Sequence, residues 1–244
     1  MYTDEYIREF YKTHTRQEVA DLLGINYNSV GHVLKRCGAY EDKKVKKTTI
    51  VNEDYFRDGS PSIDYILGYI VGDGCVRNKR TGQQEVNIWS KDTDHLIKIA
   101  EVIGYTGSLK SGINFRSDQV VDYLISKGIK PRKSKSGGIP VYKNKRDFLR
   151  GLFDSDGCVT YQHGDKLRLY FFGHKDTMKE VQKILKDELG LERNIRDRED
   201  GISEVAIFKQ EDVMKVAEYM YKYSTIHMDR KYNRFYGEDI VRHS

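Results

Sequence analysis

The hydrophobic and polar positions after residue 61 follow one order twice. An apolar stretch ends at an Asp-Gly pair, and a strand-like alternation of apolar and polar residues comes next. An amphipathic helical pattern follows, over residues 92–103 in the first copy and 176–189 in the second. Further alternation and a final helical stretch complete each copy. The pattern therefore predicts two pseudo-symmetric αββαββα units, residues 61–140 and 141–244, in an α+β fold.

The repeat is also visible in the residues themselves. The segment IDYILGYIVGDGCV at 63–76 returns as RDFLRGLFDSDGCV at 146–159. Further along, SKDTDHLIKI at 90–99 returns as HKDTMKEVQK at 174–183, at nearly the same separation. Matches that keep both their order and their separation indicate two copies of one supersecondary unit.

Residues 1–40 precede the repeat and are predicted to form a small all-α segment. Thr15 and Glu18 have the spacing of a capping box that opens a helix, and Gly24 is placed to end it. A second helix is predicted from about residue 26 to residue 36. Residues 41–60 alternate in charge without a sustained period, and we predict that they form a linker.

The two N-terminal helices and the tight turn between them resemble the helix-turn-helix motif of DNA-binding proteins. Such a motif needs a small residue where the helices cross and a glycine at the bend, which Ala20 and Gly24 supply. An ordinary helical hairpin is the alternative interpretation. If the segment binds DNA, its second helix would direct these side chains into the major groove: Asn26, Tyr27, Asn28, His32 and Lys35.

Composition narrows the class of protein. A hydrophobic fraction of 38% is enough for packed cores, and a net charge of +5 suits a polyanionic partner without proving one. Cys37, Cys75 and Cys158 lie far apart and have no neighbouring histidine, which argues against a zinc site or a disulfide framework. Because no apolar run approaches the ~18 residues of a membrane span, we expect a soluble, intracellular protein.

Small residues recur on one face of each helix that ends at Asp-Gly. Gly68 and Gly72 are four residues apart, and so are Gly151 and Ser155. Small side chains at this spacing let two helices approach more closely than the usual ~8–10 Å between helix axes. We therefore predict that these two helices pack directly against each other.

The acidic residues at the ends of these helices are the main candidates for chemistry. Asp73 and Asp156 each occupy a last helical turn, where the helix dipole disfavours a negative charge by ~0.3–1 kcal/mol. Parallel packing of the helices would add repulsion between the two carboxylates. A cation between them would relieve both effects, and oxygen-only ligands favour Mg²⁺ over Zn²⁺. Such ions could assist attack on a phosphodiester.

The two helices and their ends resemble the signature motifs of the LAGLIDADG homing endonucleases. The segments LGYIVGDG and LRGLFDSDG carry this resemblance, which extends over residues 61–244. It implies a monomeric, single-chain enzyme whose two sheets form a saddle across double-stranded DNA. It also implies that Asp73 and Asp156 are catalytic and bind Mg²⁺, for which Mn²⁺ can substitute, with Gly72 and Ser155 beside them in the metal site.

The resemblance suggests roles for further charged residues. The family uses basic side chains near the metal ions to activate water or to stabilise charge, and Lys133 and Lys231 are the candidates by position. Either could instead be an ordinary surface lysine. The first motif has Val71 where the second has Asp154. That position is not the catalytic one, and we predict a structural role for Asp154.

Polar residues at alternate positions of the predicted strands are candidates to contact DNA. Long arginine and glutamine side chains on strands can reach base edges in the major groove. Some of these residues could instead only solvate a sheet face. The candidates are Arg77, Lys79, Gln84, Asn87, Asn114, Arg116, Arg168, Tyr170, Arg196 and Arg198.

Two other functions are compatible with the same scaffold. One is a non-catalytic DNA-binding regulator, and the other is an RNA maturase that assists intron splicing. Regulators of this fold typically lack the acidic pair, so the presence of Asp73 and Asp156 favours a nuclease. Basic sheet faces do not distinguish DNA from RNA, so the maturase stays an alternative.

Overall fold

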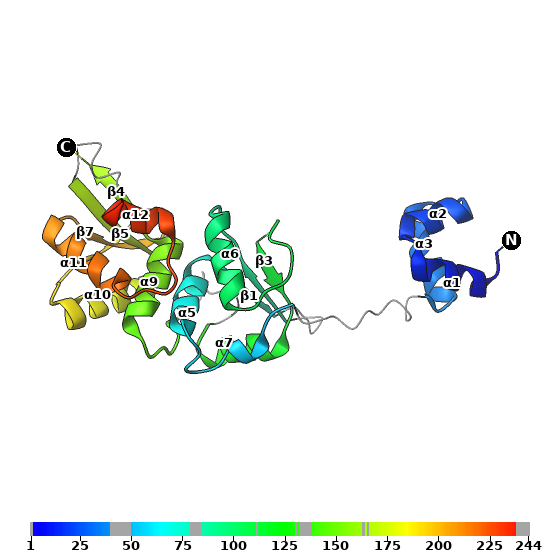
Figure 1. Cartoon of the computed structure of the whole chain (residues 1–244), viewed down its shortest axis with the longest axis horizontal. Coiled ribbons are helices and arrows are strands. Elements are labelled where there is room, and N and C mark those ends of the chain that lie inside the picture. The colour runs from blue at the N-terminus through cyan, green and yellow to red at the C-terminus, as the bar shows by residue number, and fades with distance from the viewer. Residues whose placement is uncertain are drawn as a thin grey trace. The chain divides into compact units, whose positions relative to one another are not determined.

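The computed structural model describes residues 2–39, 50–78, 84–110, 112–129, 131, 138–162, 164 and 166–237. Two of the candidate residues, Lys79 and Lys133, lie outside the described residues. The chain divides into two compact units, Met1–Thr48 and Thr49–Ser244. The first unit holds the N-terminal helices, and the second holds both copies of the repeat (Figure 1).

The described residues of the N-terminal unit form three helices, α1 (Asp4–Thr13), α2 (Arg16–Leu23) and α3 (Tyr27–Arg36). Helix α2 begins with the predicted capping box, in which Thr15 and Glu18 exchange hydrogen bonds between side chain and main chain. Gly24 ends it at a φ of 63°, a left-handed conformation that glycine adopts without a steric penalty. Buried side chains from all three helices form the core of this unit.

The second half has the predicted αββαββα order. Its elements are α9 (Lys145–Asp156), β4 (Cys158–Gln162), β5 (Lys166–Gly173), α10 (Lys175–Leu189), β6 (Ile195–Asp197), β7 (Ser203–Ile207) and α11 (Gln210–Tyr221). The strands are antiparallel in the order β4-β5-β7-β6. A further helix, α12 (Asp229–Tyr236), follows α11 and was not indicated by the hydrophobic pattern.

The first half differs from the predicted order by one strand. Its elements are α5 (Ile63–Asp73), β1 (Gly74–Asn78), β2 (Gln84–Ile88), α6 (Thr93–Val102), β3 (Ile113–Phe115) and α7 (Asp118–Ser126). Within the described ranges the sheet has three antiparallel strands in the order β1-β2-β3. Before β3 the chain turns, with one isolated bridge between Lys110 and Gly112. Gly104 and Gly107 in this stretch favour turns over a strand.

Each half packs its own hydrophobic core against one face of its sheet. Helices α5 and α9 lie side by side between the two sheets, at the centre of this unit (Figure 1). The first core also includes Tyr55 and Phe56, in and after the short 3-10 helix η1 (Glu53–Tyr55). The packed part of the first half therefore begins before residue 61, inside the stretch predicted to be a linker.

The chain between α11 and α12 crosses from the second half to the first. Ile226 and Met228 are buried in the first core, whereas Phe235 of α12 is buried in the second. The guanidinium of Arg150, which is 1% exposed, donates to the carbonyls of Met220 and Ile226 at 2.9 Å each. The chain from the end of α11 to α12 thus contacts α9 and contributes side chains to both cores. None of the helices in the described ranges has the length and hydropathy of a bilayer-spanning segment.

Candidate active site and nucleic-acid interface

Helices α5 and α9 touch through their main chains. A Cβ atom added to Gly68 would lie 2.2 Å from the carbonyl oxygen of Phe148, and one added to Gly151 would lie 2.0 Å from that of Tyr65. Both distances are well below van der Waals contact, so only glycine fits at either position without a shift of the backbone. The small residues predicted to bring the helices together are the residues at which their backbones meet.

Asp73 and Asp156 are the last residues of these two helices. Their contacts follow the same order along both helices, so the helices run parallel and both carboxylates lie at the same end. A Cβ atom on Gly72 would lie 3.1 Å from Oδ2 of Asp156, which places this carboxylate against the last turn of α5. Asp73 is half-buried and Asp156 is exposed.

At the end of each helix, one glycine turns the chain directly into a strand. The N–H of Gly74 bonds to the carbonyl of Ile70, and the N–H of Gly157 bonds to that of Phe153, although both glycines are already extended. Cβ atoms at these positions would lie 2.7 and 2.5 Å from the same carbonyl oxygens. The abrupt change from helix to strand therefore requires glycine, and it holds each carboxylate at the start of a sheet.

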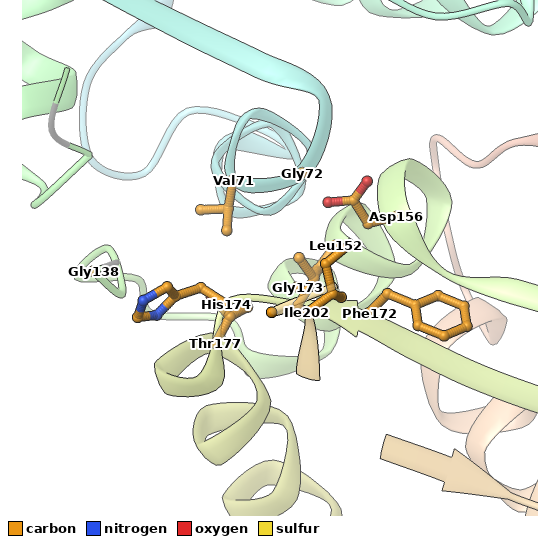
Figure 2. Close-up of a pocket in the computed structure, with 11 residues that line it drawn as sticks. Val71, Gly72, Gly138, Leu152, Asp156, Phe172, Gly173, His174, Thr177 and Ile202 are labelled. Carbon is orange, nitrogen blue, oxygen red and sulfur yellow. The ribbon is translucent and has the colours of Figure 1, made fainter. Parts of the chain in front are cut away.

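A cavity of about 210 Å³ opens beside this end of the helix pair (Figure 2). Val71 and Gly72 of α5 and Asp156 of α9 line one side of it. The end of β5, including Phe172, and the start of α10 line the other. In Figure 2 the Asp156 carboxylate is directed toward the end of α5.

The donor set at this place fits a hard divalent cation. Asp73 and Asp156 offer carboxylate oxygens to it. Within the described ranges, no group of three or more His, Cys, Asp or Glu side chains is placed to hold a metal ion, so protein side chains alone would not fill its coordination sphere. A cation here would complete its coordination with substrate and water oxygens, as Mg²⁺ commonly does. The hydroxyl of Ser155 donates to the carbonyls of its own helix, at 3.1 Å to Gly151 and 3.0 Å to Leu152. These bonds use the hydroxyl proton and leave the lone pairs of the oxygen, so a place for Ser155 in the metal site stays a prediction.

Lys231 of α12 binds the end of α9. Its Nζ lies 2.6 Å from the carbonyl oxygens of Phe153 and Gly157 and 2.9 Å from that of Asp154, and the side chain is 3% exposed. Burial lowers the pKa of Lys231 to about 8, while the carboxylates of Asp154, Asp73 and Asp156 act in the opposite direction. A cation at a helix C-terminus is favourable. This location favours a positioning role for Lys231 over direct contact with substrate.

Asp154 lies fully buried at the junction of the two halves. Its carboxylate accepts hydrogen bonds from Tyr65 at 2.9 Å, from Tyr221 at 2.7 Å and from the N–H of Met228 at 2.9 Å. Burial raises the pKa of this carboxyl, and the hydrogen bonds oppose that shift. These partners come from α5, α11 and the crossing segment, in agreement with the predicted structural role.

A buried histidine extends this network into the first half. His95 of α6 lies 2.8 Å from the hydroxyl of Tyr65, measured to Nε2. Burial lowers the pKa of His95 to about 4. The charge of Lys98 also lowers this pKa, whereas the charges of Asp92 and Asp229 raise it. His95 is therefore neutral at physiological pH, and its protonation would place a charge inside the junction.

The low pKa of His95 predicts a loss of stability in acid. An unfolded histidine titrates near pH 6.5, so between pH ~6.5 and ~4 the unfolded chain binds more protons than the folded chain. The free energy of unfolding should fall over this window by up to about 3 kcal/mol from His95 alone. Urea unfolding of a His95→Gln variant at pH 7 and at pH 4.5 should show a smaller pH dependence than the wild type. Equal pH dependence of the two proteins would contradict the assignment.

The sequence of the second half matches a family model. Residues 143–221 match the model described as "LAGLIDADG-like domain". Residues 143–221 are therefore similar in sequence to this domain. The match covers α9 to α11, including Asp156, and it confirms over these residues the resemblance drawn from the motifs.

Several solved structures are similar to this chain. They include the meganuclease I-SmaMI bound to uncleavable DNA, with 13% identity, a TM-score of 0.47, and coverage of 73% of this chain and 88% of that one. The LAGLIDADG homing endonuclease I-GzeII with its DNA target has 13% identity, a TM-score of 0.49, and coverage of 73% and 88%. Mesophilic variants of I-DmoI have 17% identity, a TM-score of 0.48, and coverage of 66% and 96%. No curated protein matches the sequence.

The first sheet turns a polar face away from its core. Asn87 pairs with Cys75 on one side and Asn114 on the other, and Arg77 pairs with Glu85 on the same face. Arg77, Asn114 and the nearby Arg116 are exposed. Within the described part of the chain, the side-chain nitrogen of Asn87 has no hydrogen-bond partner. Four of the predicted DNA contacts therefore lie on or beside one open face.

Gln84 lies on the opposite side of this sheet. It has the same parity along β2 as the buried Val86 and Ile88, and its side-chain nitrogen lies 3.4 Å from Asp122 of α7. The prediction that it contacts DNA therefore places it on the wrong face, because the alternation from Asn87 reaches Glu85 and not Gln84. The helix layer, not the open face, surrounds this side chain.

The sheet of the second half also has an open face. Lys166, Arg168, Tyr170 and Phe172 alternate along β5 with buried Leu and Phe residues. Arg196 and Arg198 lie at the far edge, where their nearest carboxylates are Glu204 at 3.8 Å and Asp200 at 3.4 Å. The structure thus brings together all four predicted DNA contacts of this half.

The predicted contacts of the N-terminal unit are all on its surface: Asn26, Tyr27, Asn28, His32 and Lys35. Asn26 is also the N-cap of α3, where its side chain accepts from the N–H of Asn28 at 2.9 Å. The guanidinium of Arg16 lies over the ring of Tyr27, 5.3 Å from its centroid. Their role in DNA binding remains a prediction.

Three aromatic residues on the open faces were not among the predicted DNA contacts. Trp89 at the end of β2 is 56% exposed, Phe208 after β7 is 49% exposed, and Phe172 is half-buried. The signal was present, because each has the same parity as the polar residues of its strand. They were left out because the predicted contacts were limited to polar side chains.

Proposed function

We propose that this protein is a metal-dependent endonuclease that cuts both strands of a DNA duplex at a specific site. The observation that carries the proposal is the pair of carboxylates, Asp73 and Asp156, at the same end of two parallel helices in main-chain contact. Such a pair is unfavourable without a cation, because both charges also oppose the helix dipoles.

The residues of the site have distinct parts in the proposed reaction. Divalent ions, when bound, would activate water and stabilise charge on the phosphate. Asp73 and Asp156 would hold the ions, and the glycine contacts fix the separation of the two helix ends. Lys231 would keep the end of α9 in place through its bonds to three carbonyls. One carboxylate from each half suits a reaction on two strands related by pseudo-symmetry.

The open sheet faces supply a surface for the duplex. Each begins directly after a catalytic candidate, because β1 follows Asp73 and β4 follows Asp156 with one glycine as the junction. Arg77 and Arg116 in the first half and Arg168, Arg196 and Arg198 in the second give these faces positive charge. Phosphate contacts would position the DNA, and contacts to base edges would select the site. The N-terminal unit would extend the recognised sequence if it binds as a helix-turn-helix.

The test is cleavage of a duplex library with a randomised site. We expect the protein to cut a defined set of sequences on both strands with Mg²⁺ or Mn²⁺, and to cut none with EDTA. Sequencing of the ends would give the site and the cut positions. Tight, selective binding without any cutting under either metal would instead indicate a regulator, and binding to structured RNA in preference to duplex DNA would indicate a maturase.

A further inference from the structure

Three aromatic side chains form a continuous stripe on the open face of the second sheet. The rings of Tyr170 and Phe172 stack at 5.8 Å between centroids and 6° between planes. Phe208 meets Tyr170 edge-on at 5.8 Å. We refer to Tyr170, Phe172 and Phe208 as the aromatic stripe. Because the core side chains Leu169 and Phe171 project from the other face of β5, the stripe does not belong to the hydrophobic core.

The neighbours of the stripe leave it raised above the sheet. Tyr170 is flanked across the sheet by Cys158 on β4 and Ala206 on β7, both small. Small flanking residues leave the rings partly exposed, so part of their apolar surface stays available to a ligand. Phe208 is 49% exposed, which is unusual for a side chain whose burial is so favourable.

Arginine side chains lie on the rings of the stripe. The guanidinium carbon of Arg168 is 4.4 Å from the centroid of Phe208, and that of Arg198 is 5.5 Å from the centroid of Phe172. Within the described part of the chain, no carboxylate forms an ion pair with the guanidinium of Arg168. Its charge is thus held beside apolar rings and not neutralised. The surface combines positive charge with uncovered aromatic area, which suits a polyanion that also carries apolar groups.

The position of the stripe connects it to the proposed active site. Phe172 and Asp156 both line the cavity at this end of the helix pair, so one end of the stripe borders the proposed active site (Figure 2). Tyr170 is the next residue outward on the same face of β5. Alternate residues of a strand are ~7 Å apart, the length of about two base steps in a DNA strand. A duplex cut at Asp156 would therefore present its neighbouring base pairs to the stripe.

We propose that the aromatic stripe reads thymine methyl groups in the half-site bound by the second sheet. The 5-methyl group of thymine is the one apolar group that the four natural base pairs present in the major groove. Aromatic carbon can contact it, whereas the polar edges of the other bases would lose hydrogen bonds to water without a replacement. The inference rests on the proposed function and specifies its substrate: duplex sites with thymines within about four base pairs of the cut on this side.

The first sheet provides the contrast. Its open face carries Asn87 and Asn114 at its centre, and amide side chains recognise adenine through N6 and N7. On the described strands of that face, Trp89 is the aromatic residue, and it stands at the end of β2. The two half-sites are therefore read by different chemistry, apolar contact on one side and hydrogen bonds on the other.

The test removes single methyl groups from the DNA. Once the library gives a site that is cut, duplexes are made in which deoxyuridine replaces thymidine in one half-site at a time. Each contacted methyl should contribute about fourfold to binding, so loss of two or more should weaken binding of the second half-site more than tenfold. The same replacement in the first half-site should have a smaller effect, whereas 7-deazaadenine, which lacks the N7 acceptor, should act mainly there.

Variants assign the effect to the stripe. Tyr170→Ser and Phe208→Ser should bind the natural site more weakly and should no longer distinguish deoxyuridine from thymidine. Tyr223→Ser is the matched control, because Tyr223 is 83% exposed and lies outside the stripe, and it should retain full discrimination. Wild-type protein that cuts its site but tolerates deoxyuridine throughout the second half-site would overturn the proposal. So would preferential binding of unpaired RNA through stacking, for which the methyl group is irrelevant. Absence of all cleavage would instead count against the endonuclease itself.

Discussion

An Asp156→Asn variant should bind its DNA site as the wild type does and should cut it at less than about one-thousandth of the wild-type rate. Asparagine keeps the size of the side chain but removes the charge that would hold a divalent ion, so the loss should be in the chemical step. Asp156 is exposed at the end of α9 and has no part in either core, so the fold should be unaffected. Asp73→Asn should behave in the same way.

The effect should extend to both strands. The Asp156 carboxylate lies against the last turn of α5, so the two acidic groups share one region and a cation between them would serve both halves. Single-turnover cleavage of a duplex labelled on each strand measures the two cuts separately. Asp187→Asn on the surface of α10 is a matched control and should cut normally. Wild-type cleavage by either site variant in Mg²⁺ would remove these carboxylates from the mechanism.

Alanine at Gly68 or Gly151 should destabilise the protein near or beyond the upper end of the ~1–3 kcal/mol range for overpacking. The added Cβ would meet a main-chain carbonyl oxygen at 2.2 or 2.0 Å, and a carbonyl in a packed helix cannot move aside alone. The melting temperature should fall by about 6–12 °C. Cleavage should also fall, because separation of the helices moves Asp73 and Asp156 apart.

Gly72 gives an internal control for this interpretation. A Cβ atom there would meet the Ser155 side chain, at 2.0 Å from Oγ and 2.5 Å from Cβ, and not the main chain. Ser155→Gly should therefore restore most of the stability that Gly72→Ala loses. The same serine change should not rescue Gly68→Ala, whose obstacle is the backbone at Phe148. Rescue of both variants, or of neither, would show that the contact is not as described. The measurement is thermal unfolding of Gly72→Ala and Gly68→Ala, each with and without Ser155→Gly.

The repeated Asp-Gly helices could be predicted from sequence because their chemistry is local. Glycine four residues from glycine permits close packing, and an aspartate before a glycine marks the helix end, so the site follows from two short segments. The alternation along β5 similarly placed Arg168 and Tyr170 on the open face. These features depend on residues that are neighbours in the chain.

Other features depend on contacts between distant segments. Lys231 stands in a polar stretch, MDRKYNRF, and nothing in that stretch shows that its ammonium group is buried under α9. The face on which Gln84 lies depends on strand register, which a short alternation leaves open by one residue. Of the aromatic stripe, the sequence analysis selected only Tyr170 as a DNA contact, because it limited the contacts to polar side chains; the position of Phe208 beside Tyr170 depends on the pairing of β5 with β7.

The crossing segment between α11 and α12 has a consequence for synthesis of the protein. Ile226 and Met228 leave the ribosome long after the rest of the first core, on the order of ten seconds later at ordinary rates of translation. Until then the first copy of the repeat has an incomplete core, although all of its helices and strands have been made. The two copies are therefore not exchangeable modules. A recombinant that replaces one half must keep residues 226–228 with the first half, whose core they complete, or that core has a gap where these side chains belong.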